Sequence, residues 1–421
     1  MLKKKWRWLL ALFVVSFLIR FCFSVMYVGF NADPHDPRFQ LSDSTKYHNT
    51  ANMLLQEHTF GGKSQVPPGY PIFLALIYFL FGTGFGAVQI IQALLSALLC
   101  IIIFDIAREI FDDATAWLAG IISAGYPFFI YWSGMLISET LFIVFYVAAF
   151  NFILKYSLHK KQSMNILGAI CLAIAALIRP VALPFIGFVM LGYIFTMKTK
   201  WQKSLLNTLV FVIIFSAVMA PWIVRNYILF NRIVPGTTQS GLMLLNGMNS
   251  KIIKNPTNVN TVIYTELDEY KNELRLLHNE SELNQKAADL AIKYYKDLII
   301  HQPKLLFKII LNKFLELWDI IPKNKSRAVK IVSALSFGIL MPFACVGLYF
   351  GIRKRRSMFF ILAAFLNTCI LGVIFVPTIR YRFPLEPFYV IVASYGLLTI
   401  YKLLPWSSIQ TNKELSHNEY T

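Results

Sequence analysis

The sequence is poor in charged residues, and among these it has far fewer acids than bases. Charged residues make up 15% of the 421-residue chain, with 22 Asp and Glu against 40 Lys and Arg. An average soluble protein carries about 25% charged residues, whereas 57% of this chain is hydrophobic. This composition excludes an ordinary water-soluble domain and indicates a chain that lies largely in lipid.

The sequence also lacks the patterns that bind metals, nucleotides or nucleic acids. Its five cysteines all lie inside apolar segments, without the spacing of metal ligands. Its Gly-Gly and Pro-Pro-Gly steps are typical of turns and do not form a phosphate-binding loop. The basic residues are scattered over the ends of apolar segments and form no basic and aromatic tract. We therefore expect no metal, no cofactor and no nucleic-acid partner.

Apolar segments of about the length needed to cross a bilayer recur along the chain. The sequence predicts an all-α polytopic membrane protein with about 10 to 11 transmembrane helices. The predicted spans are 8–29, 86–106, 114–132, 138–154, 165–178, 180–197, 205–224, 328–350, 358–376 and 388–404. The apolar run from Pro71 to Phe81 is too short to span and is expected to lie at the interface or to lead obliquely into the next span.

Clusters of Lys and Arg predict the orientation, because such residues are retained on the cytoplasmic side of a membrane. The clusters lie within 3–7, 155–161, 198–203 and 353–356. With these inside, both termini are cytoplasmic, and the loops 31–68, 132–137, 225–327 and 377–387 face outward. The net charge of +18 is then explained by basic residues that set the orientation in the membrane and attract anionic lipid headgroups.

The chain divides into four regions on these criteria. They are an N-terminal transmembrane module (1–224) with the external loop 31–68, an extracytoplasmic helical loop region (225–327), C-terminal transmembrane helices (328–405) and a cytoplasmic tail (406–421). Within the external loops, an amphipathic helix is expected after Asp43, a second begins at the capping residue Asn279, and a third follows Pro303 along the outer membrane surface.

Ionisable residues near the external face of a membrane bundle are candidates for a functional site, because each costs free energy unless it is paired or hydrated. Asp43 immediately precedes the amphipathic helix that contains Tyr47. One interpretation is a helix N-cap that accepts backbone N–H bonds. The other is a general base acting on an acceptor hydroxyl. The two roles are compatible.

Glu139 is the second candidate acid. It follows Ser138 at the expected outer start of a helix, where the positive end of the helix dipole stabilises a carboxylate. Helix capping is one interpretation. The other is a second carboxylate that faces the same external vestibule as loop 31–68 and orients the acceptor or tunes Asp43.

Arginines near the external face form the third set of candidates. Arg380 and Arg382 lie in the densest charged turn at a membrane boundary, and two guanidiniums there suit a phosphate. The alternative is that one pairs with Glu386 and the other meets lipid headgroups. Arg179 and Arg225 lie at outer helix ends, where snorkelling is the alternative to binding. Arg20 lies deep in the first predicted span and requires a partner that the sequence does not identify.

Several short motifs, in this order, make the chain resemble a known family. They are Asp43-x-x-x-Tyr47-x-x-x-Ala51, Pro67-Pro68-Gly69-Tyr70-Pro71, Ser138-Glu139-x-Leu141-Phe142, Gly168 through Arg179-Pro180, Pro221-Trp222-x-x-Arg225-Asn226 and Arg380-Tyr381-Arg382. Over most of residues 10–400 the chain resembles the bacterial family 39 glycosyltransferases. That family is related to protein O-mannosyltransferases and lipid A aminoarabinose transferases and shares their GT-C membrane fold.

The resemblance implies a glycosyltransferase of the bacterial cytoplasmic membrane that uses a polyprenyl-phosphate-linked sugar as donor and an envelope acceptor that the sequence does not identify. It implies transfer on the extracytoplasmic face with inversion, with Asp43 as general base and Glu139 as the second acid. The substrate-binding residues expected beside them are Tyr47, Arg179, Arg225, Arg380 and Arg382. Ser44 stands where many relatives carry a further acid.

Two other functional classes remain open from the sequence. A transporter or flippase of lipid-linked saccharides is the first, although the chain shows no internal symmetry of the kind common in transporters. A purely structural membrane scaffold is the second, and the external carboxylates and arginines disfavour it. Cleavage of a donor would indicate a transferase, whereas movement of the lipid without cleavage would indicate a transporter.

Overall fold

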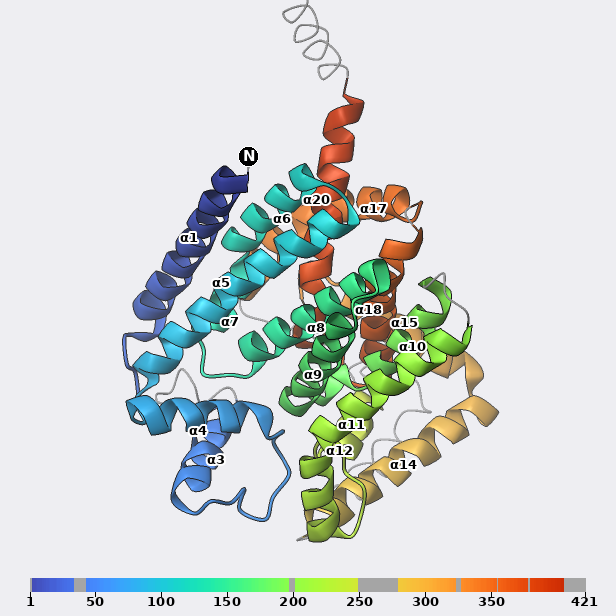
Figure 1. The fold of residues 1–421 in the computed structure, drawn as a ribbon. Coiled ribbons are helices and arrows are strands. Elements are labelled where there is room, and N and C mark those ends of the chain that lie inside the picture. Colours follow the sequence, from blue (N-terminus) through green and yellow to red (C-terminus); the bar gives the residue numbers. More distant parts are fainter. Residues whose placement is uncertain are drawn as a thin grey trace, which may run out of the picture.

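The computed structural model describes residues 2–33, 43–196, 201–248, 279–322, 327–353, 355–377 and 379–404. These residues form helices and contain no β-strand, which confirms the predicted all-α membrane fold (Figure 1). The predicted tail 406–421 and parts of the two large loops predicted to be external, 34–42 and 249–278, lie outside the described residues.

The described helices and helical turns follow one another along the chain. In chain order they are α1 (Leu2–Val28), α3 (Ser44–Gln56), α4 (Gly69–Phe81), α5 (Phe85–Ile110), α6 (Asp113–Gly125), α7 (Pro127–Ser133), α8 (Glu139–His159), α9 (Gln162–Ile178), η1 (Pro180–Ala182), α10 (Phe185–Thr196), α11 (Trp201–Phe230), α12 (Ser240–Met248), α14 (Glu280–His301), α15 (Pro303–Leu317), α16 (Arg327–Ser333), η3 (Ala334–Gly338), α17 (Ile339–Gly351), α18 (Arg355–Ile374), α19 (Ile379–Arg382), η4 (Phe383–Leu385) and α20 (Glu386–Leu403).

Every apolar segment predicted to span the membrane coincides with a helix or a bent pair of helices. By length and apolarity, six of the described stretches can cross a membrane, and the pair α6 and α7, bent by 50°, can form a seventh span. Shorter apolar helices at Gly69–Phe81, Gln162–Ile178, Pro180–Phe195 and Met358–Ile374 account for the remaining apolar segments. These short helices reach through a bilayer only where neighbouring helices shelter their ends.

The helices pack into one bundle with a continuous apolar core. Helix α5 contacts α1, α6 and α8, while α9 joins α8 to α11 and α17 pairs with α20 (Figure 1). A smaller core between α12 and α14, built on Leu245, Ala287 and Ala291, lies within the loop region 225–327 predicted to be extracytoplasmic. Asn279 caps α14 as predicted, because its side chain accepts from the N–H groups of Ser281 and Glu282.

The break between α6 and α7 accounts for the deeply placed Arg20. Tyr126 is extended because Pro127 follows it, and this leaves carbonyls at the end of α6 without helical partners. The fully buried guanidinium of Arg20 donates to the oxygens of Ser123 at 2.9 Å and Ala124 at 3.0 Å. Its Nε donates to Ser96 Oγ at 2.7 Å. The partner that the sequence does not identify is thus the negative end of a half-helix.

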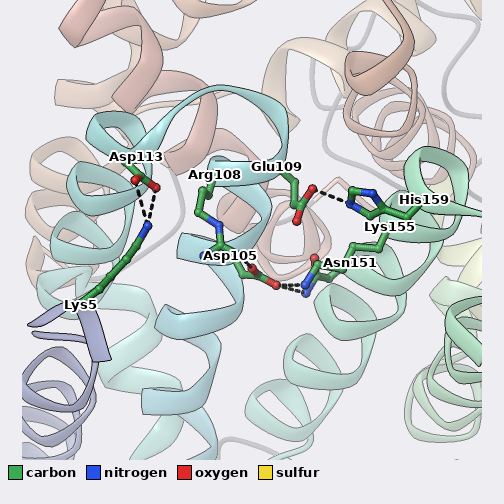
Figure 2. A network of polar contacts seen from close by, with 8 residues as sticks. All are labelled: Lys5, Asp105, Arg108, Glu109, Asp113, Asn151, Lys155 and His159. Atoms are coloured by element: carbon green, nitrogen blue, oxygen red, sulfur yellow. Dashed lines mark hydrogen bonds and ion pairs between the residues drawn. The ribbon is translucent and has the colours of Figure 1, made fainter. Parts of the chain in front are cut away.

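The two ends of the bundle are formed by different helices. The N-terminus and the end of α20 lie at one end in Figure 1, and α3, α4 and α12 lie at the other. At the first end, Figure 2 shows Asp105 of α5 between Arg108 and the α8 side chains Asn151 and Lys155. Ion pairs also join α1 to α6 and α5 to α8 at this end: Lys5 Nζ lies 2.8 Å from Asp113 Oδ1, and His159 Nε2 lies 3.0 Å from Glu109 Oε2.

Candidate functional site

Charged side chains from four separate elements meet at the end of the bundle where α3 begins. Asp43 immediately precedes α3, and Glu139 is the first residue of α8. Arg179 follows the last residue of α9, and Arg380 lies on the short helix α19. Up to 337 residues separate the members of this cluster in the chain. The fold therefore assembles a local concentration of charge from distant segments.

Glu139 is the buried centre of the cluster. Its side chain is 1% exposed, and Oε1 accepts hydrogen bonds from Arg179 Nη1 at 2.6 Å and from Arg380 Nε. Burial of a carboxylate is unfavourable unless cations compensate it, and two guanidiniums do so here. Oε2 is buried and has no hydrogen-bond partner among the described residues.

Asp43 is the more accessible acid, with 37% of its side chain exposed. Its Oδ2 accepts from Arg380 Nη1 at 3.1 Å, and its Oδ1 lies 3.7 Å from Lys46 Nζ. Asp43 occupies the N-cap position of α3, but its side chain makes no capping hydrogen bond. The capping interpretation is therefore wrong for the side chain, because the ion pair with Arg380 turns the carboxylate toward the cluster instead.

The cluster carries an excess of positive charge and unused donors. Arg179, Arg380 and Lys46 supply three positive charges against the two negative charges of Asp43 and Glu139, so the net charge is one positive. Nε and Nη2 of Arg179 and Nη2 of Arg380 have no hydrogen-bond partner among the described residues. An arrangement of partly exposed guanidiniums with free N–H groups can bind a phosphate.

Tyr47 supports this cluster from one turn into α3. It is 5% exposed, its hydroxyl lies 3.2 Å from Ser138 Oγ, and its ring packs edge-on against Tyr70 at 4.8 Å. Burial raises the pKa of the Tyr47 phenol above its usual value, although the nearby Arg179 opposes this shift. Tyr47 is therefore a neutral donor or acceptor that joins α3 to the residue preceding Glu139.

Arg225 belongs to a different set of contacts. It lies near the end of α11, its guanidinium packs over the rings of Phe60 at 5.6 Å and Trp222 at 4.9 Å, and its Nη1 donates to Ser64 Oγ at 2.5 Å. Among the described residues it makes no contact with Asp43 or Glu139. Its predicted contact with substrate stays a prediction.

Arg382 also points away from the Asp43 and Glu139 cluster. It is fully buried, its Nε lies 3.5 Å from Glu386 Oε1, and its Nη1 donates to the Asp319 carbonyl at 3.1 Å. The guanidinium lies over the Phe337 ring at 3.6 Å. This is the pairing with Glu386 considered for one of the two arginines, while Arg380 joins the acids rather than lipid headgroups. A phosphate contact by Arg382 stays a prediction.

Comparison with known proteins shows which folds and families this chain is similar to. Residues 65–224 match the family described as dolichyl-phosphate-mannose-protein mannosyltransferase. The oligosaccharyltransferase AglB of Archaeoglobus fulgidus, in complex with an inhibitory peptide and a dolichol-phosphate, shares the fold with a TM-score of 0.57 at 15% identity, over 97% of this chain and 52% of AglB. The chain has the GT-C fold. The fold predicted from the motif order is thereby confirmed.

Two further solved structures are also similar to this chain. AglB tethered to an acceptor peptide gives a TM-score of 0.57 at 16% identity, over 94% of this chain and 50% of AglB. ArnT from Cupriavidus metallidurans in the apo state gives 0.44 at 12% identity, over 93% of this chain and 78% of ArnT. The GT-C chain described here spans about half the length of AglB. A search of curated protein sequences found no match.

Sequence reasoning missed Lys46 as a member of the site of this GT-C protein. Lys46 lies three residues after Asp43 on the first turn of α3, so its side chain reaches the same side as Asp43. The i, i+3 spacing of an acid and a base was visible in the sequence. What the sequence did not show is that the Asp43 carboxylate faces Arg380.

Proposed function

We propose that this GT-C protein is a membrane glycosyltransferase. It moves a sugar from a polyprenyl-phosphate donor to an acceptor, with inversion at the anomeric carbon. The observation that carries the proposal is the chain of contacts Asp43, Arg380, Glu139, Arg179, in which one accessible acid lies beside guanidiniums that hold unused donors. The dolichol-phosphate in the AglB complex and the description of the matching family support a lipid-phosphate donor.

The two acids have different roles in this proposal. Asp43 is exposed enough for an acceptor to reach, so it takes the proton of the acceptor hydroxyl or amine. Glu139 is buried and holds Arg179 and Arg380 in place, so it acts by orienting the cations.

The reaction proceeds in one displacement. The acceptor oxygen or nitrogen forms a bond to the anomeric carbon while its proton passes to Asp43. The bond between the anomeric carbon and the phosphate oxygen breaks, and the electron pair leaves with the polyprenyl phosphate. Arg179 and Arg380 stabilise the charge that develops on that oxygen, and this stabilisation is expected to be the largest contribution to rate.

We also propose that the site faces the outside of a bacterial cytoplasmic membrane. The end of the bundle opposite the site carries Lys5, Lys155 and other basic residues, which favours a cytoplasmic location for that end (Figure 2). Both ends of the described chain, residue 2 and residue 404, belong to helices that reach the same end in Figure 1. A protease or Cys-labelling test of a tag at either terminus in intact cells checks this orientation.

The proposal is tested with purified protein in proteoliposomes. The donors are a panel of radiolabelled polyprenyl-monophosphate hexoses and pentoses, and membranes of a strain that lacks the protein supply the acceptor. The wild type should release polyprenyl phosphate from at least one donor. Asp43→Asn should lower this rate by about 100-fold or more, because general-base catalysis contributes about that factor.

The control is Asp113→Asn, which removes an exposed acid at the opposite end of the bundle and should leave the rate unchanged. Full activity of Asp43→Asn would exclude Asp43 as the base. Movement of labelled lipid across the membrane without release of polyprenyl phosphate would instead support a transporter.

A further inference from the structure

Helix α5 carries buried polar residues on one face of an otherwise apolar span. Gln89, Gln92, Ser96 and Cys100 are spaced so that they share that face, and each is at most 1% exposed. A polar side chain at membrane depth costs free energy unless it is hydrogen-bonded. The hydrogen-bond partners of these residues therefore indicate the role of this face of α5.

Gln92 bonds to two segments that lead to the two acids of the site. Its Nε2 donates to the Met135 carbonyl at 2.8 Å and to the Ser133 carbonyl at 3.3 Å. Its Oε1 accepts from the Tyr70 hydroxyl at 2.9 Å. The side-chain amide of Gln92 therefore links the end of α7 and the connection that follows it to Tyr70 of α4.

The first segment presents Glu139. Residues 134–138 form no regular helix and are buried, so their backbone groups depend on partners from neighbouring elements. Gln92 supplies such a partner at Met135, four residues before Glu139. The segment has local backbone hydrogen bonds from the N–H groups of Gly134, Met135 and Ile137. The amide of Gln92 adds the link to α5 and so limits where α8 begins.

The second segment leads to Asp43. Tyr70, held by Gln92, packs edge-on against Tyr47, and the Tyr47 hydroxyl lies 3.2 Å from Ser138 Oγ. Tyr47 is one helical turn after Asp43 on α3. These contacts link Gln92 through Tyr70 and Tyr47 to Ser138, the residue before Glu139. Together with the bonds of Gln92 to the segment before Glu139, they form a closed ring of contacts next to the charged cluster.

We propose that Gln92 is a positioning residue that sets the separation of Asp43 and Glu139, with Tyr70 as its partner. This inference rests on the proposed function for its effect on turnover. Gln92 does not touch the charged cluster, so its contribution is through the backbone before Glu139 and the ring of Tyr70. A displacement of reacting groups by about 1 Å can lower turnover by about 100-fold.

The test compares Gln92→Leu with Gln89→Leu. Gln89 lies one turn earlier on α5 and is equally buried, but it bonds to Ser24 and to the Gly29 carbonyl at the exit of α1. Each variant loses one buried amide, so both should lower the unfolding temperature by similar amounts. Hydrogen exchange at the amides of residues 134–139 should become at least about tenfold faster in Gln92→Leu only, because only that variant releases this segment.

Kinetics supply the second readout. Gln92→Leu should lower kcat by about 100-fold while KM for the lipid donor changes by less than about threefold, since the arginines remain. Tyr70→Phe should lower kcat less, and the double variant should be no worse than Gln92→Leu alone, because both act through one hydrogen bond.

The outcomes separate this inference from the proposed function. Wild-type exchange at residues 134–139 in Gln92→Leu, or equal effects of Gln92→Leu and Gln89→Leu on exchange and kcat, would overturn the positioning role. Faster exchange in Gln92→Leu together with no donor cleavage by the wild type would leave the positioning of Glu139 standing and remove the transferase.

Discussion

At the scale of single residues, Arg20 shows how this protein accommodates a cation at membrane depth without an acid. Its guanidinium donates to the carbonyls of Ser16, Ser123 and Ala124, to Ser96 Oγ and to Cys100 Sγ. The charge is balanced by the dipole at the end of α6 rather than by a carboxylate. The break between α6 and α7 therefore supplies the carbonyls that bind Arg20, and Arg20 in turn satisfies these carbonyls.

We expect Arg20→Met to lower the free energy of unfolding by several kcal/mol. The carbonyls of Ser123 and Ala124 would lose their donors, at about 1–3 kcal/mol for each unsatisfied buried group. Thermal unfolding in detergent measures the loss. Arg108→Met is the control, since Arg108 is 38% exposed and its partners Asp105 and the Phe104 ring lie on its own helix. Equal shifts for the two variants would contradict the capping role of Arg20.

Lys313 gives a prediction about pH. Its ammonium is fully buried and donates to the Val373 carbonyl at 2.9 Å at the end of α18. Burial lowers its pKa to about 8, although the charge of Glu316 opposes the shift. The unfolded chain then binds more protons than the folded chain between about pH 8 and the ordinary lysine value of about 10.4, so stability should rise with pH across that window.

The measurement is the unfolding temperature of the wild type and of Lys313→Met from pH 7 to pH 10.5. The rise above pH 8 should be larger in the wild type, and the difference between the two curves isolates Lys313 from other groups that titrate there. Parallel curves would show that Lys313 has an ordinary pKa in the folded protein.

The sequence predicted four charged site residues at helix ends, and it missed both Lys46 and residues that act through uncharged contacts, such as the proposed positioning residue Gln92. Asp43, Glu139, Arg179 and Arg380 stood out because charge is costly near lipid. Gln92 did not, since one amide in an apolar helix has no partner that can be read from spacing. For Arg382 the sequence offered the pairing with Glu386, but its contacts with the Asp319 carbonyl and the Phe337 ring are tertiary and could not be predicted from spacing.

At the scale of elements, α17 and α20 pack so closely that glycine is required on both helices. A Cβ added to Gly347 would lie 1.9 Å from the Val392 carbonyl oxygen, and one added to Gly396 would lie 1.9 Å from that of Phe343. Small residues allow such backbone approach between membrane helices. Because α20 follows directly from the Arg380 segment, this packing also fixes the base of the site.

We expect Gly396→Ala to destabilise the protein by about 1–3 kcal/mol or more, since the methyl group must push two backbones apart. Gly187→Ala is the matched control. Gly187 lies in α10, and nothing lies within 4 Å of its added Cβ. The control should be neutral or slightly stabilising, as alanine favours helix. Thermal unfolding of both variants decides this, and a neutral Gly396→Ala would show that the helices are not in such close contact.

The apolar spans were predictable because hydropathy over about 20 residues reports directly on burial in lipid. The bend within 114–132 was not predicted, although Pro127 lies inside that segment and favours an extended residue before it. A proline can kink a membrane helix or be absorbed by it. Which outcome occurs depends on partners such as Arg20, which the local sequence does not contain.

At the scale of the whole molecule, the site exists only because the bundle folds four distant segments to one end. Arg380 contacts Glu139 and Asp43, which lie 241 and 337 positions away from it in the chain. Residue spacing within one segment cannot predict that residues so distant in the chain lie close together. The expectation that they do came from the resemblance of the ordered motifs to one family. The structure then added what the resemblance did not contain: which oxygen each arginine contacts, and that Arg225 and Arg382 lie with other partners.

In the proposed function, Arg179 and Arg380 receive a lipid phosphate beside the two acids. The most direct measurement is a titration of purified protein with undecaprenyl phosphate, followed by native mass spectrometry. Arg179→Gln and Arg380→Lys should each bind about 10-fold or more weakly, since loss of a charged hydrogen bond costs about 1.5–3 kcal/mol. Arg108→Gln, at the other end of the bundle, should bind like the wild type. Equal affinity in all four proteins would contradict the account.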